Sequence, residues 1–477
     1  MHRYRRCRPA PALALLAACA SGRAVPDPRH PACDRGNGGI ALPAGFCAAV
    51  FADTIGVARH LAVGPDGIVY VALEDGSRTS AGTTRLRRAP GGIAVLRDTT
   101  GDGRADQVRR IPTAGGTGIA LRGDRLYYST MTTVERVRLS ADRMGAAGPP
   151  DTLVDGIPAE GHISRSLAFD DRGGMYVHVG SESNVCTSPG DRRGHDPCLE
   201  LEARAGIWRY DAEKLHQHHP LGGERWALGL RNAVGLAWDS TGGRLYAASH
   251  GRDGLATLWP DLYTAAASAE QPSEELVQAE RGDDFGWPYC FHDNALRRMV
   301  LAPEYGGDGK SAGRCAAVKP PLIGFPGHWA PDDLLLYTGT MFPERFRGGG
   351  FIAFHGSWNR APMPQAGYQV VFIPRAAGGF GPAYETFADG FAGGRLDPGG
   401  ARYRPVGLAQ GPDGALYITD DQRGRIWRVV STARPRGRRR RRRGATRRPP
   451  APSLPEGGRA AACRPRRGAC VPPSDRR

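Results

Sequence analysis

The sequence is poor in lysine, in long apolar runs and in helical periodicity. Lysine is almost absent: three residues (Lys214, Lys310 and Lys319) stand beside 61 arginines. No run of 18 apolar residues occurs, so no segment predicts a membrane-spanning helix. Helical periodicity is also scarce, and only residues 211–216 and 263–280 predict short helices. These shortages exclude a helical bundle and a membrane-spanning helical protein.

Two metal signatures are missing as well. No Cys-x-x-Cys-His motif occurs, which excludes a c-type haem attached to this chain. No cysteine or histidine spacing typical of a zinc site is present either. The chain therefore has no sequence signal for either of these metal centres.

The net charge of +16 comes almost entirely from the end of the chain. Residues 432–477 contain 16 Arg and two acids, Glu456 and Asp475, which leaves about +2 for the rest. A nearly neutral body gives no case for a nucleic-acid surface on it. The tail is rich in Arg and Pro and cannot bury a core, so we expect residues 432–477 to be disordered. It is either a tether to an anionic surface or to nucleic acid, or a functionless or misread end of a GC-rich coding frame. The shortage of lysine favours the functionless or misread end.

The first 20 residues have the pattern of a signal peptide. Four arginines between Arg3 and Arg8 form a basic region, and an apolar stretch follows from Pro9 to Ala18. Residues 16–19, Leu-Ala-Ala-Cys, resemble a bacterial lipobox in which Cys19 would carry the lipid. The alternative is ordinary cleavage after residues 18–20, Ala-Cys-Ala. Both predict export, to the periplasm or the outer surface of a bacterium, with a membrane contact only through a lipid at Cys19.

The chain has ten cysteines, and in an exported protein these predict disulfides. Cys7 leaves with the signal peptide, and Cys463 and Cys470 lie in the tail. The other pairs bracket short segments of the body. We expect the bonds Cys33–Cys47, Cys186–Cys198 and Cys290–Cys315.

One short phrase recurs about six times in the body of the chain. It has an apolar pair, a turn of Asp, Gly or Pro, and then an apolar run rich in aromatic residues, which is the pattern of a β-hairpin. Repeated hairpins with little helical period are typical of propeller blades. We therefore predict an all-β fold, a six-bladed β-propeller over residues 42–431. The copies are at residues 61–73, 118–130, 166–180, 235–250 and 407–421, with a more degenerate one at 334–358.

Several segments next to these repeats contain residues capable of chemistry. His162 precedes a buried strand and could be a general base, because its pKa is ordinarily near neutral, or only a packing residue. Arg231 and Asn232 precede another strand, and Arg404 precedes the last repeat. Arg360 follows Trp358, an arrangement that suits a flat anionic ligand. Each also has an ordinary explanation as a surface or packing residue.

Two loops could hold a hard cation such as Ca²⁺. The Gly-rich segment from His250 to Gly254 can present backbone carbonyls and the carboxylate of Asp253. The segment from Asp98 to Asp106 resembles a Ca²⁺-binding loop, with Asp98, Asp102 and Asp106 as candidate ligands, although Thr100 takes a usual carboxylate position and no Glu closes the loop. Both segments could instead be ordinary Asp/Gly turns.

Five motifs together resemble the glucose/sorbosone dehydrogenase family, most of all its L-sorbosone dehydrogenase-like branch. They are GHISR…LAF, GLRNAVGLAWD, FGWPY, FHGSWNR…GYQVVFIP and RPVGLAQGPDGALYITDD, in the family's order, and the similarity runs from about Leu42 to Val430. The resemblance implies a six-bladed propeller that binds pyrroloquinoline quinone (PQQ) and Ca²⁺ at the mouth of its channel. It also implies oxidation of a sugar or sugar aldehyde by hydride transfer to the quinone.

The resemblance assigns roles to particular residues. His162 matches the catalytic base of the family, and Arg231, Asn232 and Arg404 match contacts to the cofactor. Gly251 and Arg252 match the residues whose carbonyls hold the cofactor-bound Ca²⁺. Arg360 is a further candidate contact to the anionic cofactor. Three arginines would balance the three carboxylates of PQQ.

Two other functions compete with this one. A propeller hydrolase or lactonase would need Glu, Asp and Asn ligands from several blades around a metal, whereas the motifs here supply Arg and His. A noncatalytic carbohydrate- or protein-binding propeller lipoprotein would share the fold but bind no quinone. The sequence identifies neither the substrate nor the electron acceptor.

Overall fold

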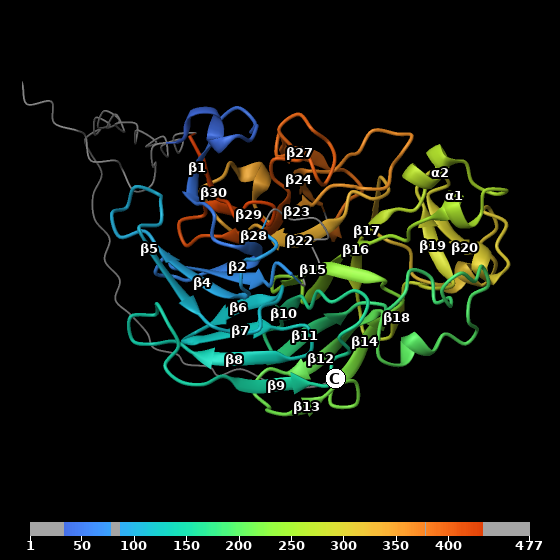
Figure 1. Cartoon of the computed structure of the whole chain (residues 1–477), viewed down its shortest axis with the longest axis horizontal. Helices are drawn as coiled ribbons and strands as arrows, with labels where there is room; N and C mark the ends of the chain where they lie inside the picture. The colour runs from blue at the N-terminus through green and yellow to red at the C-terminus, as the bar shows by residue number, and fades with distance from the viewer. Residues whose placement is uncertain (1–32, 78–85, 377, 433–477) are drawn as a thin grey trace, which may run out of the picture. The chain divides into compact units, whose positions relative to one another are not determined.

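The computed structural model describes residues 33–77, 86–376 and 378–432, and these form an almost entirely β structure (Figure 1). The predicted signal peptide, residues 1–20, and the tail from residue 433 onward lie outside the described residues. Among the described residues, no helix is long and apolar enough to cross a membrane.

Six antiparallel sheets, each built on four strands, make up the six blades, which confirms the predicted β-propeller. Blade 1 is β2 (Val57–Val63), β3 (Val69–Glu74), β4 (Gly92–Arg97) and β5 (Gln107–Ile111), and blade 2 is β6 (Ile119–Arg122), β7 (Arg125–Ser129), β8 (Val134–Arg138) and β9 (Asp151–Asp155). Blade 3 is β10 (Leu167–Phe169), β11 (Gly174–Val179), β12 (Gly206–Asp211) and β14 (Glu224–Leu228), and blade 4 is β15 (Asn232–Asp239), β16 (Arg244–His250), β17 (Glu274–Ala279) and β21 (Ile323–Phe325). Blade 5 is β22 (Pro331–Leu336), β23 (Gly350–Phe354), β24 (Gln369–Ile373) and β27 (Glu385–Ala388), and blade 6 is β28 (Pro405–Gln410), β29 (Leu416–Asp420), β30 (Ile426–Ser431) and β1 (Phe46–Ala52).

Shorter elements decorate this ring. The short strands β13 (Gln217–His218) and β18 (Asp283–Asp284) extend blades 2 and 3, and two hairpins are formed by β19 (Cys290–Asp293) with β20 (Arg298–Leu301) and by β25 (Arg375–Ala376) with β26 (Gly379–Phe380). The helices are α1 (Leu255–Leu258) and α2 (Ala265–Glu270), and the 3₁₀ turns are η1 (Arg35–Gly38), η2 (Leu199–Glu202), η3 (Pro303–Tyr305), η4 (Gly313–Ala317) and η5 (Glu344–Phe346).

Each repeated phrase of the sequence forms the two innermost strands of one blade. The innermost strands β2, β6, β10, β15, β22 and β28 contact one another around the ring. The turn between them places a residue in the left-handed region, as at Gly414, with a φ of +90°. A side chain is rarely tolerated there, which explains the Asp-Gly pair in the phrase.

The core lies between neighbouring blades. The second strands are buried on both faces, because each sheet packs against a sheet on either side, and this accounts for runs such as VYVALE in β3. Tyr70 and Val95 of blade 1, for example, share an apolar cluster with Leu126 and Val137 of blade 2. Such interlocked layers hold the loops at the edge of the ring in fixed positions.

The ring closes by pairing the first strand with the last. β1 is antiparallel to β30, with Phe46 opposite Ser431 and Val50 opposite Trp427. Residues from both ends of the described body therefore complete blade 6. The bond Cys33–Cys47 ties the preceding segment to this strand.

The other two predicted disulfides, Cys186–Cys198 and Cys290–Cys315, are also confirmed. The helix predictions were partly wrong. Residues 211–216 form no helix, and only residues 265–270 of the second stretch do so, because β17 takes the remainder. Figure 1 shows α1, α2 and the β19–β20 hairpin grouped to one side of the blades.

Candidate functional site

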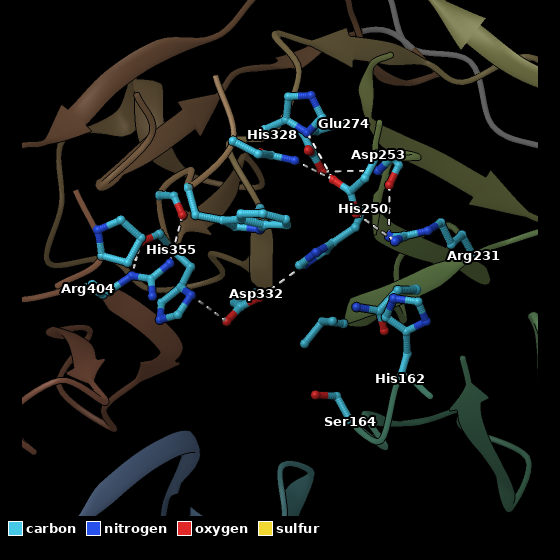
Figure 2. A pocket seen from close by; sticks show the side chains of 18 of the residues that line it. His162, Ser164, Arg231, His250, Asp253, Glu274, His328, Asp332, His355 and Arg404 are labelled. Carbon is cyan, nitrogen blue, oxygen red and sulfur yellow. Dashed lines mark hydrogen bonds and ion pairs between the residues drawn. The ribbon is translucent and has the colours of Figure 1, made fainter. Parts of the chain in front are cut away.

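A cavity of about 530 Å³ lies where the innermost strands begin and their partner strands end. Five of the six blades contribute to its lining, so its residues come from positions far apart in the sequence. The polar lining residues are Arg59, His162, Ser164, Arg231, Asn232, His250, Asp253, Glu274, His328, Asp332, His355, Asn359 and Arg404. Figure 2 shows His162 and Arg231 on one side of the cavity and His355 and Arg404 on the other, with Asp332 between them.

His162 is fixed by the end of β11. Its Nδ1 lies 2.8 Å from the carbonyl oxygen of Ser181, and its own backbone N–H donates to the same carbonyl. Because a carbonyl can only accept, Nδ1 carries the proton and Nε2 has a lone pair. Burial, and next the positive charge of Arg231, lower the pKa of His162 to about 3. The imidazole is therefore neutral at pH 7 and can accept a proton at Nε2.

Arg231 comes directly before β15 and binds the turn that follows β16. Its guanidinium donates to the carbonyl oxygen of Gly251 at 2.9 Å and to the carboxylate of Asp253 at 2.8 Å. The carboxylate of Asp253 also accepts from Asn359 at 2.7 Å and pairs with His328 at 3.2 Å. The surrounding cations and donors hold the pKa of Asp253 well below its usual range, although burial opposes them.

The opposite wall is a second charged network. Arg59, of which 2% is exposed, pairs with Asp332 at 3.1 Å and Asp421 at 2.8 Å. Asp421 also accepts from Nε2 of His355 at 2.9 Å. Arg404 donates to the carbonyl oxygens of His355 and Gly356, at 3.1 and 2.8 Å. Each guanidinium on this wall is thus held in one orientation.

Two further histidines at the lining are paired with acids. His250 lies 3.1 Å from Asp332 and His328 lies 3.2 Å from Asp253. These carboxylates raise the pKa of both histidines above its ordinary value, although burial opposes the shift. Burial also raises the pKa of Glu274. All three effects move the cavity toward positive charge, which suits an anionic ligand.

The structure brings together five of the residues expected from the sequence. His162, Arg231, Asn232, Gly251 and Arg404 all line the cavity, although they come from three different blades. Trp358, with 67% of its surface exposed, stands at the lining as well.

The structure places the side chains of Arg360 and Arg252 outside the cavity, whereas the prediction for Arg252 concerned its backbone carbonyl. Arg360 is buried, and its guanidinium donates to the carbonyls of Ala269, Gly327 and Pro364 and pairs with Glu270. The side chain of Arg252 is also buried and forms two bonds with Glu304, at 2.7 and 2.8 Å. Neither side chain lines the cavity, since backbone groups and acids outside the cavity satisfy their charges.

The Asp98–Asp106 loop is separate from the cavity. Asp98 accepts from the backbone N–H groups of Gly101 and Gly103, both at 2.7 Å, and Asp106 accepts from that of Thr99 at 2.8 Å. The carboxylate of Asp102 accepts from the backbone of Arg104 at 3.0 Å. In the described part of the chain, the three carboxylates form no cluster of ligand atoms, and their contacts are those of a tight Asp/Gly turn.

Sequence reasoning missed five charged or titratable lining residues: Arg59, Glu274, His328, Asp332 and His355. The repeat itself carried a usable signal for two of them. Arg59 stands two residues before Leu61, and Asp332 stands two residues before Leu334, at equivalent positions of their innermost strands. His355 directly follows the partner strand of its blade, as His250 ends another. Glu274 begins β17 and His328 lies in the connection between β21 and β22, and neither residue had such a signal.

The cavity has the donor chemistry for an anionic cofactor. Within the described residues, Nε of Arg231 and Oδ1 of Asn232 are buried and have no hydrogen-bond partner. Buried polar atoms normally have one, so these two residues of the lining retain hydrogen-bonding capacity that suits a polar ligand. Oxygen ligands for Ca²⁺ are also present, in the carbonyl of Gly251 and the carboxylate of Asp253. The residues therefore fit both PQQ and Ca²⁺.

Known proteins are similar to this chain in sequence and in fold. An uncharacterized protein of Borreliella burgdorferi is 31% identical over 275 residues, 56% of this chain and 60% of that protein. The pyrroloquinoline quinone-dependent pyranose dehydrogenase of Coprinopsis cinerea is 25% identical over 330 residues, 60% of this chain and 42% of that protein. The chain thus spans less than two thirds of the length of these curated relatives.

The fold has solved counterparts too. The holo form of the PQQ domain of the Coprinopsis cinerea pyranose dehydrogenase matches with a TM-score of 0.64 at 19% identity, covering 82% of this chain and 97% of that one. The expected kinship with PQQ-dependent sugar dehydrogenases is confirmed. The family model described as TrAA12-like matches residues 40–432, which include all six blades, and the chain therefore belongs to this family.

Proposed function

We propose that this protein is a PQQ- and Ca²⁺-dependent oxidoreductase that oxidises a sugar or a sugar aldehyde. One observation carries the proposal: His162 has its Nε2 lone pair available beside Arg231 and Asn232, both of which have a buried polar atom without a partner among the described residues. A base next to unsatisfied donors and acceptors is what oxidation on a bound anionic cofactor requires.

Arg231, Asn232 and Arg404 would hold PQQ, and the carbonyls of Gly251 and Arg252 would hold Ca²⁺. When bound, PQQ supplies the hydride acceptor and Ca²⁺ polarises its quinone carbonyl. The fixed guanidiniums of Arg231 and Arg404 lie on opposite sides of the cavity (Figure 2), so they can contact different edges of a planar polycarboxylate.

His162 would take the proton of the substrate hydroxyl at Nε2. The bond from Nδ1 to Ser181 holds the ring in the required tautomer and stabilises the imidazolium once the proton has arrived. Burial, and next the guanidinium of Arg231, depress the pKa of His162. An anionic group that neutralises Arg231 raises this pKa, and His162 becomes a stronger base in the loaded site.

The substrate side of the cavity is the exposed face of Trp358. An exposed aromatic plane at a polar cavity suits the apolar face of a sugar ring. We propose that residues 1–20 export the protein to the periplasm or outer surface of a bacterium, with a lipid at Cys19. The electrons would pass to a separate cytochrome or quinone.

The test uses the purified protein, titrated with PQQ in the presence and absence of Ca²⁺ and followed by the change in tryptophan fluorescence. Dye reduction is then measured over a panel of aldoses and sugar aldehydes, with His162→Ala as the control. The expected result is turnover that needs both additions and is lost in the variant. If the wild-type protein binds no PQQ, the proposal is wrong and a noncatalytic binding propeller is favoured.

A further inference from the structure

The turn from Gly251 to Asp253 forms part of the cavity wall and is held from outside by two loops. Each loop is closed by a disulfide: the first bridged loop is residues 186–198, after β11, and the second is residues 290–315, which contains β19 and β20. Neither loop belongs to a blade. The turn is bound by Asn184, two residues before the first bridged loop, and by Glu304, within the second.

Asn184 connects the first bridged loop to the turn. Its Nδ2 donates to the carbonyl oxygen of Asp253 at 2.9 Å, and its Oδ1 accepts from the backbone N–H of Asp253 at 2.9 Å. One side chain thus satisfies both backbone groups of Asp253. The carbonyl of Asn184 in turn accepts from the indole of Trp287 at 2.9 Å.

The second bridged loop holds the neighbouring residue. Glu304, whose side chain is fully buried, binds the guanidinium of Arg252 through both oxygens and also accepts from the indole of Trp259 at 2.8 Å. The two bridged loops are joined to each other as well. The backbone N–H of Gly194 donates to the carbonyl of Glu304 at 3.0 Å, and the hydroxyl of Tyr305 donates to that of Val185 at 3.1 Å.

On the side that faces the cavity, the same turn binds residues of the lining. The carboxylate of Asp253 contacts Arg231, His328 and Asn359, and the carbonyl of Gly251 accepts from Arg231. A shift of Asp253 by a fraction of an ångström would therefore move four groups of the lining together. Preorganised sites lose affinity when their supporting contacts are loosened.

We propose that Asn184 is a positioning residue for the cofactor site, and that the Cys186–Cys198 disulfide sets the affinity of the site by holding Asn184 against Asp253. Cys186 lies two residues after Asn184, and the disulfide closes a loop with a sequence separation of 12. Without the disulfide, residues 186–198 regain conformational freedom. The free-energy cost of holding both hydrogen bonds between Asn184 and Asp253 then rises. The inference rests on the proposed function for the identity of the ligand.

Gln217 provides a matched control. Its side chain makes the same pair of bonds with one backbone, donating to the carbonyl of Asp211 at 2.8 Å and accepting from its N–H at 3.0 Å. Gln217 lies in β13 and does not line the cavity. If Asn184 has only a structural role, Asn184→Ala and Gln217→Ala should therefore change the Kd for PQQ to a similar extent. For the disulfide, the control is removal of Cys33–Cys47, which has a comparable sequence separation of 14.

The experiment compares full-length Asn184→Ala, Asn184→Gln, Gln217→Ala, the double variant Cys186→Ser with Cys198→Ser, and the double variant Cys33→Ser with Cys47→Ser. For Asn184→Ala and the Cys186/Cys198 variant we expect the Kd for PQQ to rise about 10-fold, with little change in kcat at saturating PQQ. Asn184→Gln should recover part of the affinity. The two controls should keep the wild-type Kd. Equal Kd values in Asn184→Ala and Gln217→Ala would overturn the inference.

A second measurement needs no cofactor. Hydrogen exchange of the apo-protein should accelerate at the amide of Gly251, which donates to Glu274 at 3.2 Å, in Asn184→Ala but not in Gln217→Ala. This amide is not a partner of Asn184, so its exchange reports the position of the whole turn. Unchanged exchange would contradict the positioning role. If the wild-type protein binds no PQQ, the proposed function fails, and the exchange measurement alone decides the role of Asn184.

Discussion

Arg231 donates a hydrogen bond to the carbonyl oxygen of Gly251 at 2.9 Å. The residue proposed to bind the anionic cofactor is thus bonded to the carbonyl proposed to bind Ca²⁺. A cation at this carbonyl and the guanidinium of Arg231 repel each other unless an anion lies between them. Binding of PQQ and of Ca²⁺ should therefore be cooperative, each raising the affinity for the other.

Replacement of Arg231 by Ala should weaken PQQ binding by about 10- to 100-fold, because hydrogen bonds to charged groups contribute about 1.5–3 kcal/mol. Arg231→Lys should recover only part of this loss, since an ammonium lacks the planar fork. Calorimetric titration with PQQ at fixed Ca²⁺ measures both. A wild-type affinity in Arg231→Ala would remove this residue from the cofactor site.

Replacement of His162 by Gln should reduce kcat by roughly 10²- to 10⁴-fold, the usual contribution of a general base. The Kd for PQQ should change much less, because the proposed proton acceptor, Nε2, is not assigned a contact to the cofactor. Single-turnover dye reduction separates the two quantities. A parallel loss of binding and turnover would mean that His162 is a binding residue instead.

Replacement of Arg360 by Ala should reduce stability without changing PQQ affinity. Its guanidinium satisfies the carbonyls of the buried residues Ala269 and Gly327, which would lose their partner, at a cost of roughly 2–3 kcal/mol. Urea denaturation gives the stability, and PQQ titration of the folded variant gives the affinity. A large loss of affinity in a stable variant would return Arg360 to the cofactor site, as the sequence predicted.

His219 should make the protein sensitive to acid. Its Nδ1 lies 2.6 Å from the hydroxyl of Tyr210 and its Nε2 lies 2.7 Å from the carbonyl of Ala203, and burial lowers its pKa to about 4. Between pH 6.5 and 4 the unfolded chain binds a proton that the folded protein does not, so this contribution to stability is complete above pH 6.5 and declines as the pH falls.

The variant His219→Gln cannot gain this proton. Its free energy of unfolding should therefore fall by roughly 2 kcal/mol less than that of the wild type between pH 7.5 and 4.5. Urea denaturation at the two pH values measures the difference. An identical fall in both proteins would show that His219 is not the group that titrates.

The fold could be predicted from the sequence because each blade repeats the same local hairpin pattern. The turn of Asp and Gly, with apolar residues on both sides, is determined within about 15 residues, and residues 407–421 are as clear a copy as residues 61–73. Helices were predicted less well. Residues 271–279 have no strong local preference, and pairing with β16 makes Glu274–Ala279 a strand.

The site was only partly predictable, for a different reason. His162, Arg231 and Arg404 belong to recognisable motifs, but the orientation of a long side chain depends on which acceptors lie near it in space. Arg360 and Arg404 are both arginines in loops at the edge of the ring. Glu270 and the carbonyl of Gly327 bind the guanidinium of Arg360 outside the cavity. The carbonyls of His355 and Gly356 bind that of Arg404 at the lining. No local pattern in the sequence encodes those partners.

The pairing of β1 with β30 has a consequence for the synthesis of the protein. Ser431 and Gly45, which are hydrogen-bonded, are 386 residues apart in the sequence, so β1 leaves the ribosome long before its partner exists. The ion pair of Arg59 with Asp421 also forms only after the last part of the body has been synthesised. Five blades consist of continuous stretches of the chain, whereas the ring and one wall of its cavity need residues from both ends of the described body. A nascent chain that stalls before Asp421 would carry most of the blades and no complete binding site.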